Sequence, residues 1–384
     1  MLYLVGIVIT FFLFLLLTTK KNKSDADKIL ASWLLFIGVH LGIYYLHKTG
    51  QFNYFPYLLG FEIPLPLLHV PFLYLYISSL TNQTKNKIFR LIHFLPFVLT
   101  YFLLFDFLTS SLLHKKYVYE HNGIGYEKTM FFFNWIIIIQ GIVYIILSIY
   151  KLKKHQQNIL SKFSNTTKIN LNWLLYLTIG ISFIWFAIIY GKDEIIFSIV
   201  VLFVLFIGYF GIKQVGIFTN NEFQTPIEDL DILSKEESNI LPPILLTEEQ
   251  LNKQEKVKYE KSKINQQEIS IIHLNLSKLM DKEKLFKNPE LTLSDLAQKL
   301  LVHPNTLSQV INSVEQKNFY DYINLQRIEE FKSLAFLPEN KEYTLLSLAF
   351  ECGFNSKSSF NRNFKKATNL SPSEYLNQAN IHLY

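Results

Sequence analysis

Cysteine is almost absent from this sequence. Among 384 residues there is one cysteine, Cys352, which excludes an intramolecular disulfide and a zinc site built on cysteine pairs. Such a lone cysteine is interpreted as a small buried apolar residue. The motifs of common catalytic sites are missing too: there is no glycine-rich phosphate loop, no kinase nucleotide-binding pattern and no HExxH metal motif. We therefore expect no enzymatic activity, no metal and no cofactor.

Charged residues are scarce over long stretches of the first half. Six stretches contain no Asp, Glu, Lys or Arg: residues 1–19, 29–47, 63–84, 129–150, 169–191 and 195–212. A seventh, residues 91–108, is broken only by Asp106. A helix needs about 20 apolar residues to cross the hydrocarbon core of a bilayer. These runs therefore predict seven transmembrane helices within residues 1–215.

Charge divides the chain into three regions. Residues 1–215 carry 18 Lys and Arg against 8 Asp and Glu, residues 216–265 carry 6 against 10, and residues 266–384 carry 13 against 13. These differences predict a transmembrane domain, a cytoplasmic linker and a soluble domain with those boundaries. The linker region has no sustained heptad pattern. We expect a flexible tether that spans roughly 35–40 Å on average.

The predicted loops differ in their content of Lys and Arg. If the N-terminus lies outside, the inner loops 20–28, 85–90 and 151–168 hold twelve of these residues and the outer loops hold five. Cytoplasmic loops carry the excess of Lys and Arg, so the sequence predicts a multi-pass protein of the inner (cytoplasmic) membrane with its N-terminus outside. Seven crossings then place the C-terminal domain in the cytoplasm. The first run has no evident small-residue cleavage site, so we expect it to remain as a helix.

Polar side chains within or near the predicted helices are candidates for sensing a signal. Four of them are singled out: His40, His69, His93 and Asp106. Ionisable groups at membrane depth are costly and often mark a functional site. Histidines that bond neighbouring helices, and an acid that reaches water at a helix end, are alternatives that the sequence leaves open. Pro64, Pro66 and Pro71 crowd the third run, where we expect them to bend the helix or delay its start.

Residues 266–384 show the periodicity of helices, and one pattern occurs twice. Apolar residues at three-to-four spacing from Ile269 to Phe286 predict a leading helix. Residues 291–312 predict two short helices, the second opened by Pro304, and a longer helix follows over 318–336. Leu296-Ala297 and Leu348-Ala349 then lie 52 residues apart, which indicates a diverged internal repeat.

The second copy of this pattern carries recognisable turn and cap residues. Gly353 supplies a tight turn, Phe354 fills the core and Ser356 caps the next helix. Asn369 can take a left-handed turn before a last helix that Pro372 opens. The segments are GFNSKSSFNRNFKK at 353–366 and NLSPSEYL at 369–376.

With these motifs, the stretch 291–378 resembles the AraC/XylS class of bacterial transcription regulators. The layout of membrane domain and regulator resembles regulators common in Bacteroidetes-type bacteria. The resemblance covers under a third of the chain and implies two recognition helices set in successive major-groove segments on one face of DNA. Two residues depart from the usual pattern: His303 replaces a better helix cap, and Asn369 replaces a glycine.

The outward-facing residues of the two recognition helices are the candidates for DNA contact. On the first helix they are Asn305, Thr306, Ser308, Gln309 and Asn312, and on the second Lys357, Ser358, Asn361, Arg362, Lys365 and Lys366. Asn361 and Arg362 lie between the apolar Phe360 and Phe364, and so project outward. We expect Arg362 to contact guanine and Asn361 adenine. Lys365 and Lys366 are expected to hold phosphates.

Together these patterns predict an all-α chain, a seven-helix transmembrane bundle followed by a double helix-turn-helix domain. The function expected is that of a membrane-anchored one-component transcription regulator that responds to a signal at the membrane. Its expected partners are promoter DNA, membrane lipid, an unknown ligand and a second copy of the chain on DNA. RNA polymerase is a further possible partner. A transporter or channel with a regulatory cytoplasmic domain is the alternative, although no inverted repeat is evident. An adaptor that binds protein is a third class, which the outward Arg, Lys and Asn residues disfavour.

Overall fold

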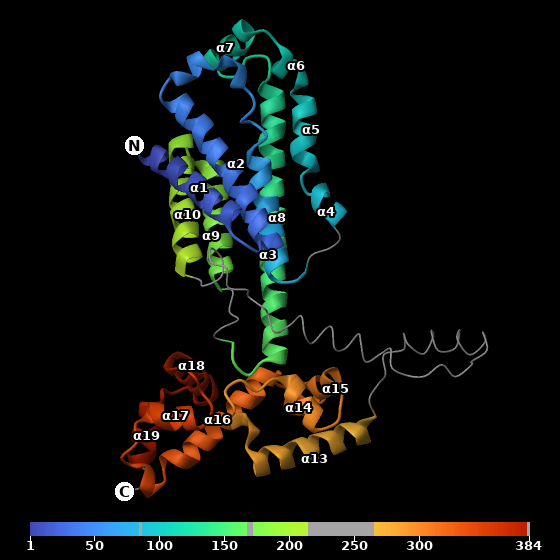
Figure 1. Ribbon diagram of the computed structural model, residues 1–384, viewed down its shortest axis with the longest axis vertical. Coiled ribbons are helices and arrows are strands. Elements are labelled where there is room, and N and C mark those ends of the chain that lie inside the picture. The colour runs from blue at the N-terminus through green and yellow to red at the C-terminus, as the bar shows by residue number, and fades with distance from the viewer. Residues whose placement is uncertain (84–86, 167–171, 214–264, 382–384) are drawn as a thin grey trace, which may run out of the picture. The chain divides into compact units, whose positions relative to one another are not determined.

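The computed structural model is a chain of helices joined by loops (Figure 1). It describes residues 1–83, 87–166, 172–213 and 265–381, and no named β-strand forms within them. The expected all-α fold class is confirmed. The chain divides into two compact units. Unit 1 comprises Met1–His155 and Leu171–Phe223, and unit 2 comprises Gln156–Asn170 and Gln224–Tyr384. The predicted linker, 216–265, lies outside the described residues except for its last position.

Unit 1 is built from helices of very different length. They are α1 (Leu2–Thr19), α2 (Asp25–Lys48), η1 (Gln51–Tyr54), η2 (Pro56–Leu58), α3 (Pro66–Leu80), α4 (Lys87–Ile92), α5 (Leu95–Leu103), α6 (Phe105–Thr109), α7 (Leu112–Glu120), α8 (Glu127–Lys162), α9 (Asn172–Tyr190) and α10 (Asp193–Lys213). The last turns of α8 belong to unit 2, so this one helix contributes residues to both units.

Five described helices are long and apolar enough to cross a membrane: α1, α2, α8, α9 and α10. They correspond to five of the seven predicted runs. The other two runs form shorter helices, because residues 63–84 give α3 with 15 residues and residues 91–108 give α5, α6 and the end of α4. The number of membrane crossings therefore stays a prediction.

Proline explains the short α3. The helix begins at Pro66 and contains Pro71 in its interior. A proline in the first turn loses no hydrogen bond, whereas an interior proline removes one. The predicted late start of this helix is confirmed. The run 91–108 is divided where α5 ends at Leu103 and α6 begins at Phe105.

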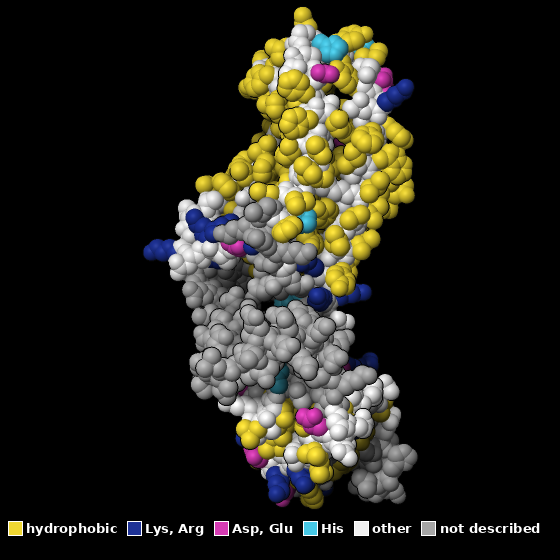
Figure 2. All heavy atoms as spheres, turned by 90° about the vertical axis from the view of Figure 1, so that its right-hand side faces the viewer, with side chains coloured by type: hydrophobic (Ala, Val, Ile, Leu, Met, Phe, Trp, Pro, Cys, Tyr) yellow, Lys and Arg dark blue, Asp and Glu magenta, His cyan; other side chains and the backbone are white. Residues whose placement is uncertain are grey.

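Apolar side chains cover much of the exposed surface of unit 1 (Figure 2). The exposed ones on α8 include Phe131, Trp135, Ile139, Ile142 and Ile146, which recur every three or four residues. This spacing places them along one face of the helix. Monomeric soluble proteins rarely expose apolar patches of such extent, whereas a bilayer is a favourable solvent for them. The surface of unit 1 is thus compatible with a membrane-anchored protein.

The interior of unit 1 is centred on α2. Trp33, Leu34 and Leu41 of this helix are fully buried, and α1, α3 and η1 are among the elements that pack against it. Ser24 and Asp27 form a capping box at its start, with Asp27 N donating to Ser24 Oγ at 3.1 Å and Ser24 N donating to Asp27 Oδ2 at 2.9 Å. The cap fixes the point at which the chain turns from α1 into α2.

Unit 2 contains two helix-turn-helix repeats. Its described elements after the linker are α13 (Gln266–Glu283), η4 (Leu285–Lys287), α14 (Leu293–Lys299), α15 (Pro304–Val310), the π-helical turn η5 (Ile311–Glu315), α16 (Phe319–Ala335), η6 (Pro338–Asn340), α17 (Leu345–Glu351), α18 (Lys357–Thr368) and α19 (Pro372–Ile381). The leading helix, the joining helix and both helix pairs match the predicted ranges closely.

Each repeat of unit 2 has its own hydrophobic core. The first core joins α13, α14 and α15 to the start of α16 through Phe319 and Ile323. The second joins α17 and α18 to the end of α16 through Ile328 and Phe331. Because α16 is one helix shared by both cores, it fixes the spacing between the two repeats.

Side-chain caps set the helix boundaries in unit 2. Thr292 caps α14 in a capping box with Asp295, and Ser356 caps α18. His303, expected to be a poor cap, accepts from Asn305 N through Nδ1 at 3.2 Å. Asn369 ends α18 at φ +62°, as predicted. Pro372 begins α19, also as predicted.

Equivalent turns in the two repeats use different residues. Gly353 has φ +96°, and a Cβ atom at this position would lie 2.5 Å from the carbonyl oxygen of Phe286. Only glycine fits such a close approach. Leu301 lies 52 residues earlier, at the same point of the first repeat, and is left-handed at φ +55°. Its side chain is 92% exposed, and Val302 N donates to Ala297 O at 3.0 Å across the turn. The left-handed conformation thus closes the first turn although a leucine adopts it only with strain.

The single cysteine lies in the second core. Cys352 is fully buried, as the sequence predicted, and burial raises the pKa of its thiol to about 12. The thiol is therefore protonated and shielded from reagents in the folded chain.

Candidate functional site

The two recognition helices expected from the sequence are α15 and α18. Each is the second helix of its repeat, and α16 joins the repeats. On α18 the buried residues are Ser359, Phe360, Asn363 and Phe364, which follow the helical period. The opposite face is exposed and consists of Lys357, Ser358, Asn361, Arg362, Lys365 and Lys366. All six predicted residues of this helix therefore lie on one accessible, basic face.

The first recognition helix presents polar but uncharged side chains. Asn305, Gln309 and Asn312 are exposed, and Thr306 and Ser308 are half-buried. Asn312 belongs to the π-helical turn η5, which continues α15, and its Nδ2 donates to Ser308 Oγ at 3.5 Å. The wider turn shifts Asn312 from the position that a regular α-helix would give it.

Hydrogen bonds from the joining helix reach the outward face of α18. Tyr320 Oη accepts from Arg362 Nη2 at 2.9 Å and from Asn363 Nδ2 at 2.8 Å. Lys366 Nζ lies 2.6 Å from Asp321 Oδ1 in an ion pair. Sequence reasoning missed these partners because they lie more than 40 residues away in the chain. Lys366 must share its charge between Asp321 and any DNA phosphate, whereas Lys365 has no such neighbour among the ion pairs of the described residues.

A buried arginine, also missed in the sequence, lies in the middle of the joining helix. Arg327 is 2% exposed, and burial lowers the pKa of its guanidinium to about 10. Its Nε donates to Phe286 O at 2.7 Å, and its Nη2 donates to Asn288 O at 2.8 Å. These bonds tie α16 to η4 and to the loop that follows it before α14. The sequence offered one signal of this burial: Arg327 lies one turn before Phe331, on the inner side of α16.

Residues that follow α8 complete the surroundings of Arg327. Ser164 Oγ accepts from Arg327 Nη2 at 3.1 Å and donates to Leu291 O at 2.6 Å. Ser164 O accepts from Asn324 Nδ2 at 3.1 Å. Phe163 is buried and forms an antiparallel bridge with Thr292. We call residues 159–165 the docking segment.

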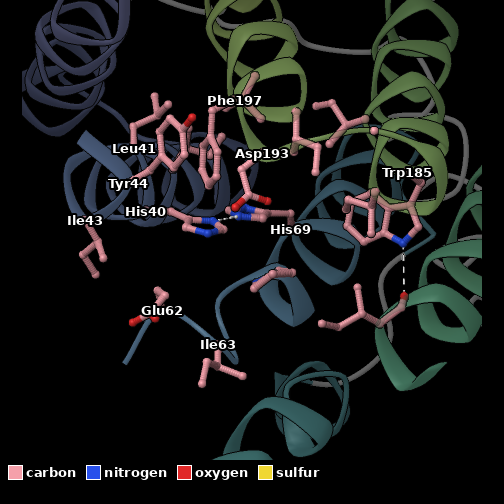
Figure 3. A pocket seen from close by; sticks show the side chains of 18 of the residues that line it. His40, Leu41, Ile43, Tyr44, Glu62, Ile63, His69, Trp185, Asp193 and Phe197 are labelled. Atoms are coloured by element: carbon pink, nitrogen blue, oxygen red, sulfur yellow. Dashed lines mark hydrogen bonds between the residues drawn. The ribbon is translucent and has the colours of Figure 1, made fainter. Parts of the chain in front are cut away.

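Two of the four candidate sensor residues meet in unit 1. His40 of α2 and His69 of α3 stack with ring centroids 5.4 Å apart, and His40 Nδ1 lies 3.1 Å from His69 Nε2 (Figure 3). His93 lies elsewhere and bonds Tyr144 Oη through Nδ1 at 2.7 Å. Asp106 is exposed on α6. The structure thus separates the four residues into one pair and two single side chains.

The hydrogen-bond pattern fixes the tautomers of the histidine pair. Trp33 Nε1 lies 3.3 Å from His69 Nδ1. An indole nitrogen only donates, so His69 Nδ1 must accept and His69 Nε2 must carry the proton. That proton is donated to His40 Nδ1, which leaves the proton of neutral His40 on Nε2. The described residues supply no hydrogen bond for this Nε2–H.

The histidine pair lines a cavity of about 660 Å³ in unit 1. Figure 3 shows His40, His69, Glu62, Asp193 and Trp185 around it. His93 and Asp106 are not among its lining residues. No cluster of three or more His, Cys, Asp or Glu suited to a metal ion occurs in the part of the chain that the structure describes. The cavity is therefore a candidate site for an organic molecule.

Known proteins resemble the C-terminal part of this chain. Residues 296–378 match the family model of a helix-turn-helix domain. Over 93 residues, 24% of this chain, the sequence is 33% identical to the uncharacterized HTH-type transcriptional regulator YijO of Escherichia coli (strain K12). The alignment covers 32% of that relative's length. No solved structure matches the chain. The C-terminal part of this chain is an AraC-type helix-turn-helix DNA-binding domain.

Proposed function

We propose that this chain is a membrane-anchored transcription regulator that reads promoter DNA in response to a signal at the membrane. One observation carries the proposal: a DNA-binding domain with an exposed basic helix shares its chain with five long apolar helices that expose apolar faces. In this proposal the five helices, together with α3 and the run 91–108, make seven crossings. The N-terminus lies outside and unit 2 lies in the cytoplasm.

Arg362 and the neighbouring residues of α18 would read base edges. Arg362 donates to Tyr320 through Nη2, and its other N–H groups make no hydrogen bond with a described residue. A guanidinium held at one end by Tyr320 is oriented before DNA arrives, so less side-chain freedom is lost on binding. Asn361 beside it can pair with adenine. On α15, Gln309 and Asn305 are the most accessible candidates for the second half of the site.

DNA selection with the full chain in lipid nanodiscs tests this function. We expect enrichment of a sequence with two short elements, because each recognition helix reads one segment of the major groove. Arg362→Ala should cost about 1–3 kcal/mol and relax the preference at one base pair. Tyr320→Phe should cost less and leave the preferred base unchanged. Lys341→Ala, on the exposed loop before α17, is the matched control.

Two results of this selection would contradict the proposal. Recovery of no preferred sequence by the full chain would remove sequence-specific reading. A variant Arg362→Ala with unchanged affinity and base preference would remove α18 from the interface. A reporter fused after Tyr384 tests the proposed topology separately, since activity on the outer side of the cell would exclude a role at cytoplasmic DNA.

Dimerisation on DNA is the proposed way in which a signal acts. Tandem weak sites gain affinity when two linked domains bind adjacent repeats. Crosslinking in membranes, with and without a stimulus, should show more dimer in the stimulated state, and a constant monomer would remove this mechanism. RNA polymerase is a further proposed partner at the promoter. No enzymatic activity belongs to the proposal.

The cavity in unit 1 favours one alternative, a transporter with a regulatory cytoplasmic domain. Transporters bind substrate near the bilayer midplane between helices, and this cavity lies among α2, α3, α8, α9 and α10. Uptake of a cavity ligand into sealed vesicles that contain the chain distinguishes the two functions. A regulator binds the ligand without moving it, whereas a transporter accumulates it inside the vesicles.

A further inference from the structure

We infer that the cavity of unit 1 binds an organic cation with an apolar body and a hydrogen-bond acceptor. Such a ligand would be the signal of the proposed regulator, so its regulatory meaning rests on the proposed function. Its binding rests only on the residues that line the cavity.

Charge at the cavity favours a cation. Glu62 and Asp193 are among the lining residues, and no Lys or Arg of the described residues is. The Glu62 carboxylate is held by Tyr119 Oη and by Gly60 N at 3.1 Å, so it stays at the cavity. Asp193 makes no hydrogen bond or ion pair with a residue that the structure describes. His47, which also lines the cavity, lies with its Nε2 3.8 Å from Glu62 Oε1. A carboxylate ligand would meet two acids, whereas an ammonium group would be attracted by both.

The walls of the cavity suit an apolar or aromatic body. The aromatic lining residues are Trp33, Tyr44, Tyr119, Phe133, Trp185, Phe197 and Phe203. The faces of Trp, Tyr and Phe rings attract cations as well as apolar groups. Trp185 is fixed by a hydrogen bond from its Nε1 to Ile137 O at 3.1 Å. A volume of about 660 Å³ lies within the range of small-molecule sites.

The histidine pair adds a directional requirement. Because Trp33 and His69 fix the tautomers of both rings, His40 Nε2–H has no hydrogen-bond partner among the described residues. A ligand oxygen or nitrogen that accepts from this N–H therefore gains a hydrogen bond. The ligand class is therefore an amine with an acceptor atom and an apolar body, rather than a bare alkylammonium ion.

Three probes with the same body test the charge. They are 4-(4-methoxyphenyl)butylamine, 4-(4-methoxyphenyl)butan-1-ol and 4-(4-methoxyphenyl)butanoate. The ether oxygen of each probe supplies the acceptor, and the three probes carry a cation, a neutral hydroxyl and an anion. Binding to the full chain in phosphatidylglycerol nanodiscs is measured by calorimetry, with empty nanodiscs to subtract partition into lipid. We expect the amine to bind at least tenfold more tightly than the alcohol, and the anion to bind most weakly. Equal binding of the three, stronger binding of the anion or no binding of the amine would overturn the inference.

Isosteric variants locate the site. Glu62→Gln and Asp193→Asn together should reduce the preference for the amine over the alcohol at least tenfold. Asp106→Asn, an exposed carboxylate outside the cavity, is the matched control and should leave the preference unchanged. If the control variant loses the preference as fully as the double variant, the amine binds elsewhere. The charge preference is decided by the probe series on the unaltered chain. A variant that folds poorly therefore does not change that result.

Two further experiments test where the natural cation comes from and whether its binding regulates the protein. Phosphatidylethanolamine added to the nanodiscs weakens probe binding if a lipid headgroup is the natural occupant, and leaves it unchanged if a free amine is. DNA affinity measured with and without 4-(4-methoxyphenyl)butylamine tests the link to regulation. An unchanged DNA affinity with intact amine binding supports the site and overturns its role as the signal site.

A different set of contacts carries a second proposal. We propose that the docking segment holds the first repeat against the joining helix and thereby sets DNA affinity. Ser164 bonds Leu291 of the loop before α14 and, on the other side, Arg327 and Asn324 of α16. Removal of the segment would leave Arg327, buried and charged, with fewer acceptors. This would destabilise the contact between the first repeat and α16. If this contact is looser, the two repeats lose more conformational entropy when both recognition helices bind DNA, and DNA affinity falls.

The helix that contains the start of this segment also lines the cavity. α8 contributes Phe133 and Ile137 to the lining, and its last turn contains Ile159, the buried start of the docking segment.

Paired alanine variants of the full chain test the docking segment. Phe163→Ala with Ser164→Ala should lower DNA affinity at least fivefold. Gln157→Ala with Asn158→Ala, two exposed residues of α8, is the matched control and should leave the affinity unchanged. Thiol labelling of Cys352 in each variant reports whether the second core is intact. Unchanged DNA affinity in the docking variant, or an equal loss in the control, would overturn the proposal.

Discussion

The turn at Gly353 offers the sharpest test of how unit 2 is held together. A Cβ atom there would lie 2.5 Å from Phe286 O and 2.8 Å from Lys287 O. The same Phe286 oxygen accepts the hydrogen bond from Arg327 Nε at 2.7 Å. Gly353→Ala therefore places a side chain in a left-handed backbone and pushes away the acceptor of a buried charge.

The magnitude follows from these two effects. A left-handed residue with a side chain costs about 1–2 kcal/mol, and weakening a hydrogen bond to a charged group costs about 1.5–3 kcal/mol. A total of about 3 kcal/mol corresponds to a roughly 100-fold change in an equilibrium constant, at about 1.4 kcal/mol for each factor of ten. The second core of Gly353→Ala should therefore open about 100 times more often.

Thiol labelling measures this opening. Cys352 is the single cysteine of the chain and is fully buried beside the turn, so a maleimide reagent reacts only when the second core opens. Gly353→Ala should be labelled about 100 times faster than the unaltered chain. Leu301→Ala, at the equivalent turn of the first repeat, is the control and should be labelled at the unaltered rate. Equal rates for Gly353→Ala and the unaltered chain would refute the reasoning.

Three further predictions follow from single positions. Leu301→Gly removes left-handed strain from an exposed residue and should stabilise the first repeat by about 1 kcal/mol, seen as slower hydrogen exchange there. Gly141→Ala places a Cβ where Trp185 Nε1 lies and should lower the thermal midpoint of unit 1, since overpacking costs about 1–3 kcal/mol; Gly42→Ala, with open space around it, should not. Lys365→Ala should weaken binding to all DNA sequences alike and reduce the salt slope by about 1, and an unchanged slope excludes the phosphate contact.

Local signals made unit 2 largely predictable from the sequence. Thr292, Ser356 and Pro372 mark helix starts, and each acts within the next three residues of chain. The outward position of Asn361 and Arg362 followed from Phe360 and Phe364, because a helix separates faces by a fixed period. These signals depend on neighbours in sequence, so they could be recognised without the tertiary structure.

Other features of unit 2 could not be read in this way. The ion pair of Lys366 with Asp321 and the bond of Arg362 to Tyr320 join residues more than 40 positions apart. Ser164 and Arg327 are separated by 163 positions. The sequence showed the predicted inner loop 151–168 only as a basic loop, since nothing local marks a segment that packs against a distant domain.

In unit 1, too, some features could be predicted from the sequence and others could not. Runs without charge were sufficient to predict α1, α2, α8, α9 and α10, because a long apolar helix needs only composition and length. The runs around α3 and α5 were less regular, since Pro66 and Pro71 limit one helix and the other is interrupted at Leu104. His40, His69, His93 and Asp106 were equal candidates in the sequence, and only the folded chain pairs the first two.

The sequence alone predicted most of the long helices, which of their faces are apolar, and a repeated DNA-binding pattern that follows membrane-compatible helices. Each of these depends on composition, period or a cap within one turn. The tertiary structure decided which side chains meet: the histidine pair at the cavity, the acids beside it, and the docking segment against Arg327. Such meetings depend on how distant helices pack, and no local pattern in the chain encodes them.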